Sequence, residues 1–256
     1  ESLWSGSFGE VTNDSNLVGV NGTGVNASTR LAIPAISGNP GTCRYGEFDG
    51  TSSYIEVPHS DQLNGDKALT YMAWVRPDGW SGIQQVMAKS VHGGGAGRAQ
   101  MGIFSEGGVL KGRAESVSGV VEVSTALPLV GGWTHVALVF NDTSLSLYIN
   151  GSLASSTSFG STELATNSDP LNIGKRVGSS QYFFDGLIDE VRVFSRALPA
   201  SAIAFYRNFS RPCSAPAINH YEISVTTPSL TCEGSPVVIT AHDAADNPLA
   251  PAAGTV

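Results

Sequence analysis

The sequence predicts an all-β protein built as an antiparallel sandwich, and three features of the chain support this fold class. Charged residues make up only 14% of its 256 residues, whereas glycine is abundant at 30 residues. Serine and threonine are also plentiful, and such a composition suits short strands joined by tight turns better than it suits helices. Short runs of alternating apolar and polar residues recur between Gly, Pro and Asp-Gly turn signals, at spacings typical of a sandwich.

The predicted strands follow one another between residues 54 and 194. The clearest turn signal among them is Asn150-Gly151, which is typical of a type I′ hairpin. Strands are predicted over residues 54–57, 68–76, 84–89, 99–104, 109–114, 122–124, 133–141, 145–150, 152–158, 171–174 and 187–194. Residues 1–42 are rich in Gly, Asn, Ser and Thr and are predicted to be irregular. Residues 199–206 have the spacing of a short helix that closes the domain.

A domain boundary is predicted after this helix. Residues 1–211 form the first predicted domain, and residues 212–217, which contain proline, form a linker. Residues 218–256 carry two further strand patterns and are interpreted as the truncated start of a second, Ig-like β domain. Because about forty residues cannot bury an independent core, we expect the later strands of this domain beyond residue 256. The chain begins with Glu rather than Met, so we also expect it to be a processed piece of a longer protein.

The charge of the chain narrows the range of partners. The formal net charge is -8 and no run of Lys or Arg occurs, which argues against nucleic acid or an anionic membrane surface as a partner. No apolar run reaches the roughly 18 residues of a membrane-spanning helix, so no membrane insertion is expected. An acidic surface is compatible with calcium and with neutral sugars.

The last strand predicted before the helix is apolar but carries two adjacent carboxylates. Side chains alternate sides along a strand, so Asp189 and Glu190 are predicted to face opposite ways. Strict alternation places Asp189 on the same side as Val191 and Val193, in line with the core. A carboxylate in that position needs a partner, a proton or a cation. The pattern therefore predicts a cation site inside the sandwich.

Three cysteines occur, and none has the spacing of a zinc or thioredoxin-like site. A disulfide between Cys43 and Cys213 would tie together the two ends of the first domain, and we favour this pairing over free thiols because the composition is typical of extracellular proteins. Cys232 would then find its partner beyond residue 256.

Five sequence blocks carry a family resemblance. They are residues 47–58, 69–77, 132–137, 147–151 and 186–198, and they include a Phe-Asp-Gly turn and an Ile-Asp-Glu-Val strand. In this order and spacing they resemble the concanavalin A-like, laminin G-type (LamG) jelly-roll family, from residue 1 to about residue 211. Residues 41–46 and 211–232 more narrowly resemble the bacterial MshQ-type proteins of mannose-sensitive haemagglutinin (MSHA) pilus biogenesis. This resemblance implies a LamG module ahead of a β-rich domain in an exported protein of the cell surface.

The resemblance also implies a metal site. In such jelly rolls the aspartates that correspond to Asp49 and Asp189 commonly meet at one calcium ion, and backbone carbonyls such as that of Gly50 complete the shell. Calcium prefers six to eight oxygen ligands, which carboxylates, turn carbonyls and water supply. The alternative is that Asp49 caps its own turn and Asp189 accepts backbone N–H groups.

Catalysis is not expected. Glycoside hydrolases of this fold need two carboxylates in an open cleft, and no such paired motif occurs in the sequence. No Gly-x-Ser-x-Gly nucleophile elbow lies between a strand and a helix either. The sequence therefore predicts a protein that is not an enzyme.

Binding is expected to reside in loops. Trp80 lies in a turn, where a sugar ring can stack on it, although it can equally cover the end of the sandwich. His92 and Arg98 flank a Gly-rich run, and Tyr182 precedes the Ile-Asp-Glu-Val strand. These residues predict a carbohydrate- or surface-binding adhesin at the cell surface. The alternative function is an assembly module that contacts pilus subunits and recognises no glycan.

Overall fold

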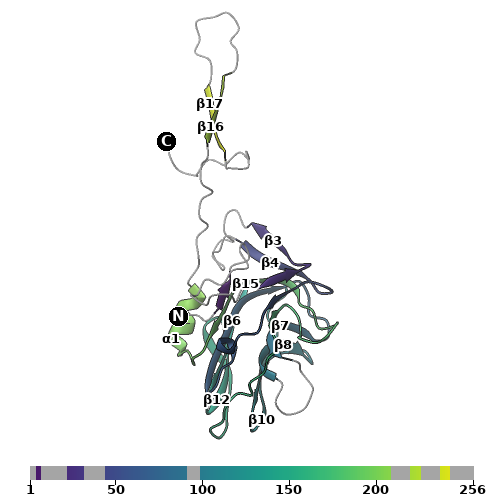
Figure 1. Ribbon diagram of the computed structural model, residues 1–256, viewed down its shortest axis with the longest axis vertical. Helices are drawn as coiled ribbons and strands as arrows, with labels where there is room; N and C mark the ends of the chain where they lie inside the picture. Colours follow the sequence, from purple (N-terminus) through teal and green to yellow (C-terminus); the bar gives the residue numbers. More distant parts are fainter. Residues whose placement is uncertain are drawn as a thin grey trace, which may run out of the picture. The chain divides into compact units, whose positions relative to one another are not determined.

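The computed structural model describes residues 4–6, 22–31, 44–90, 99–208, 220–225 and 237–242 (Figure 1). The chain divides into two compact units, Glu1–Pro212 and Cys213–Val256. Within the described residues, no helix is both long and apolar enough to cross a membrane.

The first unit contains fifteen strands, one α-helix and one short 3-10 helix within its described residues. The strands are β1 (Trp4–Gly6), β2 (Thr23–Val25), β3 (Ser28–Leu31), β4 (Arg44–Asp49), β5 (Tyr54–Val57), β6 (Ala68–Pro77), β7 (Gln84–Ser90), β8 (Ala99–Glu106), β9 (Val109–Ser116), β10 (Gly119–Ala126), β11 (Thr134–Asn141), β12 (Ser144–Ile149), β13 (Ser152–Ser158), β14 (Leu171–Ile173) and β15 (Asp185–Phe194). The 3-10 helix η1 is Asp61–Leu63 and the helix α1 is Ala200–Asn208.

These strands form two antiparallel sheets that pack face to face. The first sheet has the order β13-β12-β11-β6-β15-β4-β3, and β1 also pairs with β15. The second sheet has the order β10-β9-β8-β7-β14-β5-β2. Neighbours in both sheets are often distant in sequence, as expected of a jelly roll. The predicted all-β, concanavalin A-like sandwich is thus confirmed.

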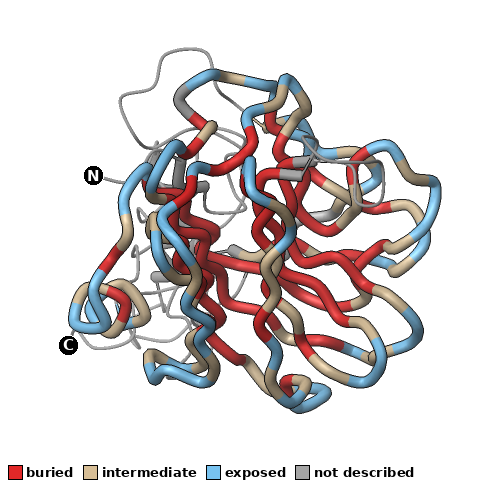
Figure 2. Tube along the Cα trace, turned by 90° about the horizontal axis from the view of Figure 1, so that it is seen from below, coloured by how far each residue is buried: buried red, intermediate tan, exposed pale blue. Residues whose placement is uncertain are grey.

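Alternating side chains divide the core into two clusters on opposite faces of the first sheet. In β6, the inward residues Leu69, Tyr71 and Ala73 join residues of the second sheet in the main cluster between the sheets. Met72 points the other way and packs with Ile203 of α1 in a smaller cluster. Strands β6 and β11 are therefore buried on both faces because a helix covers the side that faces away from the second sheet. In Figure 2 the buried residues run along the strands and the exposed residues along the turns.

The beginning of the chain is more regular than its composition predicts. Residues 1–42 were expected to be irregular, yet β1, β2 and β3 lie within them. Strand β4 was not predicted either. The partners of β1 and β2 are β15 and β5, which lie further along the chain, so their pairing depends on long-range contacts rather than local pattern.

A bulge in β15 breaks the strict alternation that the sequence predicts. The register with β6 passes from Asp189 opposite Trp74 to Arg192 opposite Met72, and Glu190 has a φ of 49°. Ile188, Val191 and Val193 all join the main cluster, so the extra residue shifts the later side chains to the other face. The expectation that Asp189 shares a face with Val191 and Val193 was wrong.

Strands β16 (His220–Val225) and β17 (Val237–His242) form an antiparallel pair in the second unit, with Ile223 opposite Ile239. Both lie close to the two strands predicted there, at residues 220–226 and 236–241. An Ig-like fold for this unit stays a prediction.

Candidate functional site

A polar pocket lies at one end of the sandwich, and we call it the Asp185 pocket. Its cavity has a volume of about 500 Å³. The turn after β4, the connection between β6 and β7 and the connection into β15 supply its lining. Polar lining residues include Asp49, Thr51, Ser81, Gln84, Ser180 and Asp185, and Tyr182 adds an aromatic ring.

A repeated Phe-Asp-Gly tripeptide builds the centre of this pocket. It occurs at residues 48–50, where β4 ends, and at residues 184–186, where β15 begins. The strands are antiparallel and place Asp185 directly opposite Asp49. Directly opposed residues have Cβ atoms about 5 Å apart, so the two carboxylates are neighbours. The repeat was present in the sequence, but Asp185 was missed because the predicted strand began at residue 187.

Both glycines of the repeat are required by the backbone. Gly50 has a φ of 69°, and its N–H donates to the carbonyl oxygen of Phe184 at 3.0 Å. Gly186 has a φ of 135°, and a Cβ there would lie 2.3 Å from the carbonyl oxygen of Arg76. A side chain at residue 186 would therefore force β6 and β15 apart.

Asp49 caps the turn that follows it. Its Oδ1 accepts the backbone N–H groups of Thr51, Ser52 and Ser53 at 2.9, 2.7 and 2.9 Å, and its Oδ2 accepts the Ser52 hydroxyl at 2.7 Å. Burial alone would raise the pKa of Asp49, but these hydrogen bonds outweigh it and hold the pKa well below its usual range. Asp49 is therefore a fixed negative charge whose oxygens are already engaged.

Asp185 is half-buried and is positioned by its backbone. Its N–H donates to Oε1 of Gln84 at 3.2 Å, and its carbonyl oxygen accepts the N–H of Asp78 at 3.0 Å. Burial, followed by the nearby carboxylates of Asp78 and Asp49, raises the pKa of Asp185. The pocket thus holds a carboxylate whose ionised form would be stabilised by a hydrogen-bond donor or a cation.

Tyr182 forms one edge of the pocket in a strained backbone conformation. Its φ is 67°, which is unusual for a bulky residue. Its carbonyl oxygen accepts the N–H of Gln85 at 3.1 Å, which fastens this connection to β7. The Arg176 guanidinium carbon lies 5.1 Å from the centre of the Tyr182 ring.

The structure does not bring Asp49 and Asp189 together. Asp189 lies four residues beyond Asp185 along β15, which corresponds to about 13 Å at the rise of a strand. Its Oδ1 accepts the N–H of Glu190 at 2.8 Å. The predicted pairing of these two carboxylates at one calcium ion was therefore wrong, and both make the backbone contacts of the alternative.

A guanidinium supplies positive charge close to Asp189. Arg192 follows on the same strand and pairs with the carboxylate of Glu190, and all three residues are buried. Burial lowers the pKa of Arg192, while the charges of Glu190 and Asp189 oppose that shift. Arg192 also lies over the ring of Tyr206 in α1, at 5.7 Å from its centre.

The described part of the chain contains no group of three or more His, Cys, Asp or Glu side chains arranged to hold a metal ion. Of the predicted ligands, Asp49 and Gly50 line the Asp185 pocket, whereas Asp189 does not.

Trp80 covers the end of the core instead of offering an open stacking face. It is half-buried against the main cluster, and its ring meets that of Phe184 edge to face at 5.9 Å. Its indole N–H donates to the carbonyl oxygen of Pro128 at 2.9 Å. These contacts agree with the structural alternative for this residue. The predicted binding residues His92 and Arg98 and the predicted disulfide partners Cys43 and Cys213 lie outside the described residues.

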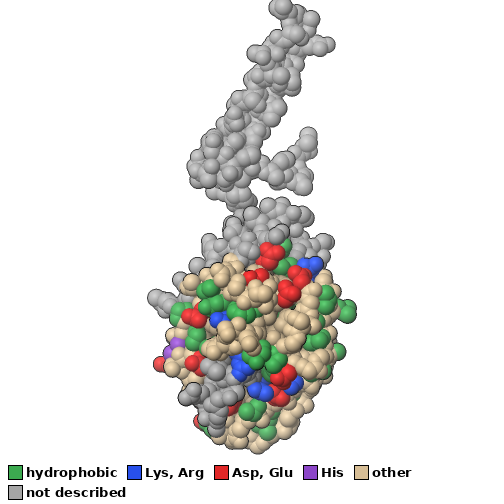
Figure 3. All heavy atoms as spheres, turned by 90° about the vertical axis from the view of Figure 1, so that its right-hand side faces the viewer, with side chains coloured by type: hydrophobic (Ala, Val, Ile, Leu, Met, Phe, Trp, Pro, Cys, Tyr) green, Lys and Arg blue, Asp and Glu red, His purple; other side chains and the backbone are tan. Residues whose placement is uncertain are grey.

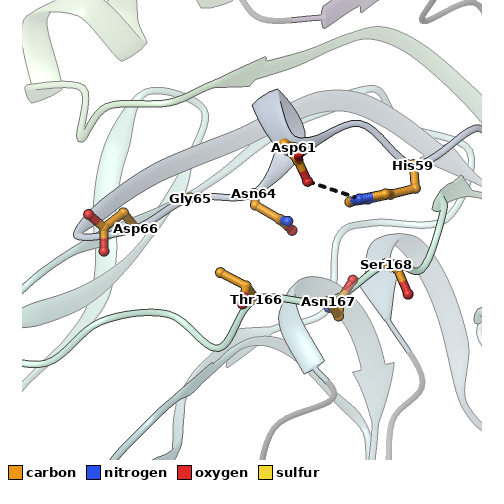
Figure 4. A pocket seen from close by; sticks show the side chains of 8 residues that line it. All are labelled: His59, Asp61, Asn64, Gly65, Asp66, Thr166, Asn167 and Ser168. Atoms are coloured by element: carbon orange, nitrogen blue, oxygen red, sulfur yellow. Dashed lines mark ion pairs between the residues drawn. The ribbon is translucent and has the colours of Figure 1, made fainter.

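A second cavity, of about 510 Å³, lies at the opposite end of β7. The buried Lys89 lies beside it and donates to Oδ1 of Asn167 at 2.8 Å and to the carbonyl oxygen of Asp169 at 2.9 Å. Lys89 Nζ also lies 3.3 Å from Nδ1 of His59, whose Nε2 is 3.2 Å from Asp61 (Figure 4). Lys89 therefore ties β7 to two connections of the cavity. No sequence pattern indicated this cluster, because Lys89 lies within an ordinary strand pattern.

Two antiparallel sheets that pack face to face place the first unit among the β sandwiches. The chain belongs to the concanavalin A-like lectin/glucanases superfamily, because the Laminin_G_3 family model of that description matches residues 49–204. This confirms the LamG-like resemblance of the sequence blocks, but it does not extend to the MshQ-type resemblance. No curated protein matches the chain.

Several solved structures share the fold. Domain 4 of AbnA, a GH43 extracellular arabinanase from Geobacillus stearothermophilus, in complex with arabinotriose, has a TM-score of 0.58 at 17% identity over 81% of this chain and 100% of that domain. The binding domain of botulinum neurotoxin serotype G has a TM-score of 0.60 at 14% identity over 81% of this chain and 50% of its own. The binding domain of botulinum neurotoxin DC, in complex with SialylT, has a TM-score of 0.55 at 14% identity over 74% and 46% of the two chains. At such identities the similarity shows the fold alone, and the chain spans about half the length of the neurotoxin domains.

Proposed function

We propose that the chain is a non-catalytic carbohydrate-binding module that takes up its ligand in the Asp185 pocket. The observation that carries this proposal is that Asp185, Tyr182 and the hydroxyl-bearing residues Thr51, Ser81 and Ser180 line one pocket. Such a set suits the hydroxyl groups and the apolar face of a sugar ring. The arabinotriose complex of AbnA domain 4, which shares the fold, supports this class of ligand.

A binding role fits the two central carboxylates better than hydrolysis does. Glycoside hydrolysis needs one carboxyl group as acid and a second carboxylate as nucleophile or base. Both oxygens of Asp49 accept hydrogen bonds from their own turn, so this carboxylate is engaged in holding the loop. This supports a module without catalysis, as the sequence predicts.

A glycan array followed by calorimetry on the bound glycan tests the proposal, with arabinotriose as the first probe. We expect Asp185→Ala and Tyr182→Ala each to weaken binding about 10- to 100-fold, the effect of losing a buried charged hydrogen bond or an aromatic contact. Asp61→Ala, in the second cavity, is the matched control and should bind as the wild type does. Undiminished binding by Asp185→Ala at an unchanged melting temperature would place the site elsewhere.

We propose that calcium binds at Asp185 rather than at Asp189. Burial, followed by the carboxylates of Asp78 and Asp49, raises the pKa of Asp185, so a divalent cation there would relieve the repulsion among the three carboxylates. We expect calcium to raise the melting temperature of the wild type and of Asp189→Asn by the same increment, and not that of Asp185→Asn. Thermal unfolding in calcium and in EDTA measures this. Equal melting temperatures of the wild type in both buffers would remove calcium from the proposal.

We propose that the protein is exported and lies at the surface of a bacterial cell. It rests on the composition and on the resemblance to MshQ-type pilus proteins. The alternative partner is a pilus subunit, in which case the module would assemble protein and recognise no glycan. This alternative would be favoured if the protein binds no glycan on the array but captures pilus subunits in a pull-down.

A further inference from the structure

Arg176 is a guanidinium without a carboxylate in an ion pair among the described residues, and it lies over the ring of Tyr182, which lines the Asp185 pocket. It lies on the connection between β14 and β15 and is only partly exposed. Its Nε is buried and has no hydrogen-bond partner, and among the described residues no carboxylate forms an ion pair with this side chain. Burial lowers the pKa of Arg176. A partly buried guanidinium whose Nε has no hydrogen-bond partner can donate to a ligand at this position.

The neighbouring basic residues on the same face are paired, in contrast to Arg176. Lys111 Nζ lies 2.6 Å from a carboxylate oxygen of Glu106, and Arg113 donates from Nε to Glu122 at 2.6 Å. Figure 3 shows basic and acidic side chains gathered side by side on one face of the first unit. Arg113 and Glu106 are close enough to act on the charge of Arg176, one lowering and the other raising its pKa. Arg176 is therefore the cation of this group whose hydrogen-bond donors are available to a ligand.

Tyr182 connects Arg176 to the pocket. The guanidinium stacks on the Tyr182 ring at 5.1 Å, and Tyr182 also lines the pocket that holds Asp185. The charges that raise the pKa of Asp185 are those of Asp78 and Asp49, and Arg176 is not among the groups that act on it. Arg176 lies on Tyr182, and Tyr182 and Asp185 both line the pocket, so the positive and negative groups can contact different parts of one ligand.

We propose that Arg176 binds the carboxylate of an acidic sugar, a uronic or nonulosonic acid, whose neighbouring sugar occupies the Asp185 pocket. This inference rests on the proposed function and specifies its ligand class. The planar fork of a guanidinium matches the two oxygens of a carboxylate. An acidic sugar inside the pocket would be repelled by Asp185, so its charge belongs on the Arg176 side of Tyr182.

Calorimetry with matched pairs of glycans tests the inference: 3′-sialyllactose against lactose, and tetragalacturonate against the same oligosaccharide with its carboxylates reduced to alcohols. We expect the acidic member of at least one pair to bind the full chain about tenfold or more tightly than its neutral partner. Arg176→Gln should remove this preference, and Arg176→Lys should restore part of it. Lys67→Gln, which removes the same charge from a residue beside the second cavity, should keep the preference in full.

The stability of the variant separates ligand binding from structural support. Arg176→Gln removes no hydrogen bond, so its melting temperature should equal or exceed that of the wild type. Equal affinity within every pair, or a preference that survives Arg176→Gln, would overturn the inference and leave the carbohydrate-binding module in place. If no member of either pair binds, the inference fails, and the glycan array with arabinotriose decides the proposed function separately.

Discussion

At the scale of single residues, His135 is a histidine kept neutral by its surroundings. It is fully buried on β11, and its ring meets that of Trp74 at 5.5 Å. Neither ring nitrogen has a hydrogen-bond partner within the described residues. Burial, with the positive charges of Arg192 and Arg207, lowers the pKa of His135 to about 3. This side chain is a source of acid sensitivity rather than a general base.

The low pKa makes a prediction about stability. Between pH 6.5 and 3 the unfolded chain protonates this histidine while the folded chain does not, so the folded state loses stability as the pH falls through this range. The slope from one such group reaches about 1.4 kcal/mol per pH unit. We expect His135→Leu to lose less stability than the wild type between pH 7 and 4.5 in urea unfolding. Parallel pH profiles of the two proteins would show that the pKa of His135 is not lowered in the folded state.

At the scale of elements, the sequence places most accurately the strands whose partners follow closely along the chain. Strands β11, β12 and β13 are joined by tight turns, and their positions agree with the pattern of the sequence to within one residue. Strand β4 carries Gly46 and a mixed pattern, and its pairing with β15 gives it its order. The bulge at Glu190 has no local signal, because nothing marks a glutamate for a positive φ.

The candidate site was predictable to the extent that its residues lie in turns. Asp49, Gly50 and Tyr182 were identified from the sequence, although Asp49 and Gly50 were expected to bind a metal with Asp189. Asp185 could have been found from the repeated Phe-Asp-Gly, but only antiparallel pairing of the two copies shows that they meet. The availability of Arg176 depends on which neighbouring charges are paired, and no local pattern contains that information.

Lys89 ties β7 to the connection that contains His59 and to the connection that contains Asn167 and Asp169. Its substitution should therefore lower the stability of the fold. Lys89→Met would leave the carbonyl oxygens of Asn167 and Asp169 without this donor, at a cost of about 1 to 3 kcal/mol in the free energy of unfolding. Lys67→Met, which removes an exposed lysine paired with Glu163 at 3.7 Å, should change it by less than about 0.5 kcal/mol. Chemical unfolding at pH 7.5 measures both.

The same lysine should give a pH signature. Burial lowers the pKa of Lys89 to about 8, against the nearby charges of Asp169 and Asp61. Between pH 8 and 10.5 the unfolded chain therefore binds more protons than the folded chain, so the wild type gains stability relative to Lys89→Met as the pH rises. A stability difference that stays constant from pH 7.5 to 9.5 would contradict a lowered pKa.

At the scale of the whole molecule, the first unit contains every group to which a function is assigned. The Asp185 pocket and the second cavity, beside Lys89, lie at the two ends of β7. Both core clusters also belong to this unit. The contacts that define it end at Pro212. The second unit has a pair of strands of its own, β16 and β17. Folding and ligand binding are therefore expected to be properties of the first unit.

A shortened chain tests this division. A chain that ends at Ser214 keeps Cys43 and Cys213, so the predicted disulfide is unchanged. We expect its main unfolding transition within about 2 °C of that of the full chain, because the packed core is the same. Its affinity for the glycan found on the array should also be unchanged. A fall of more than about 5 °C, or weaker binding, would show that the second unit supports the first. Cys213→Ser in the full chain tests the disulfide separately, with an expected loss of about 2 to 5 kcal/mol if the bridge forms.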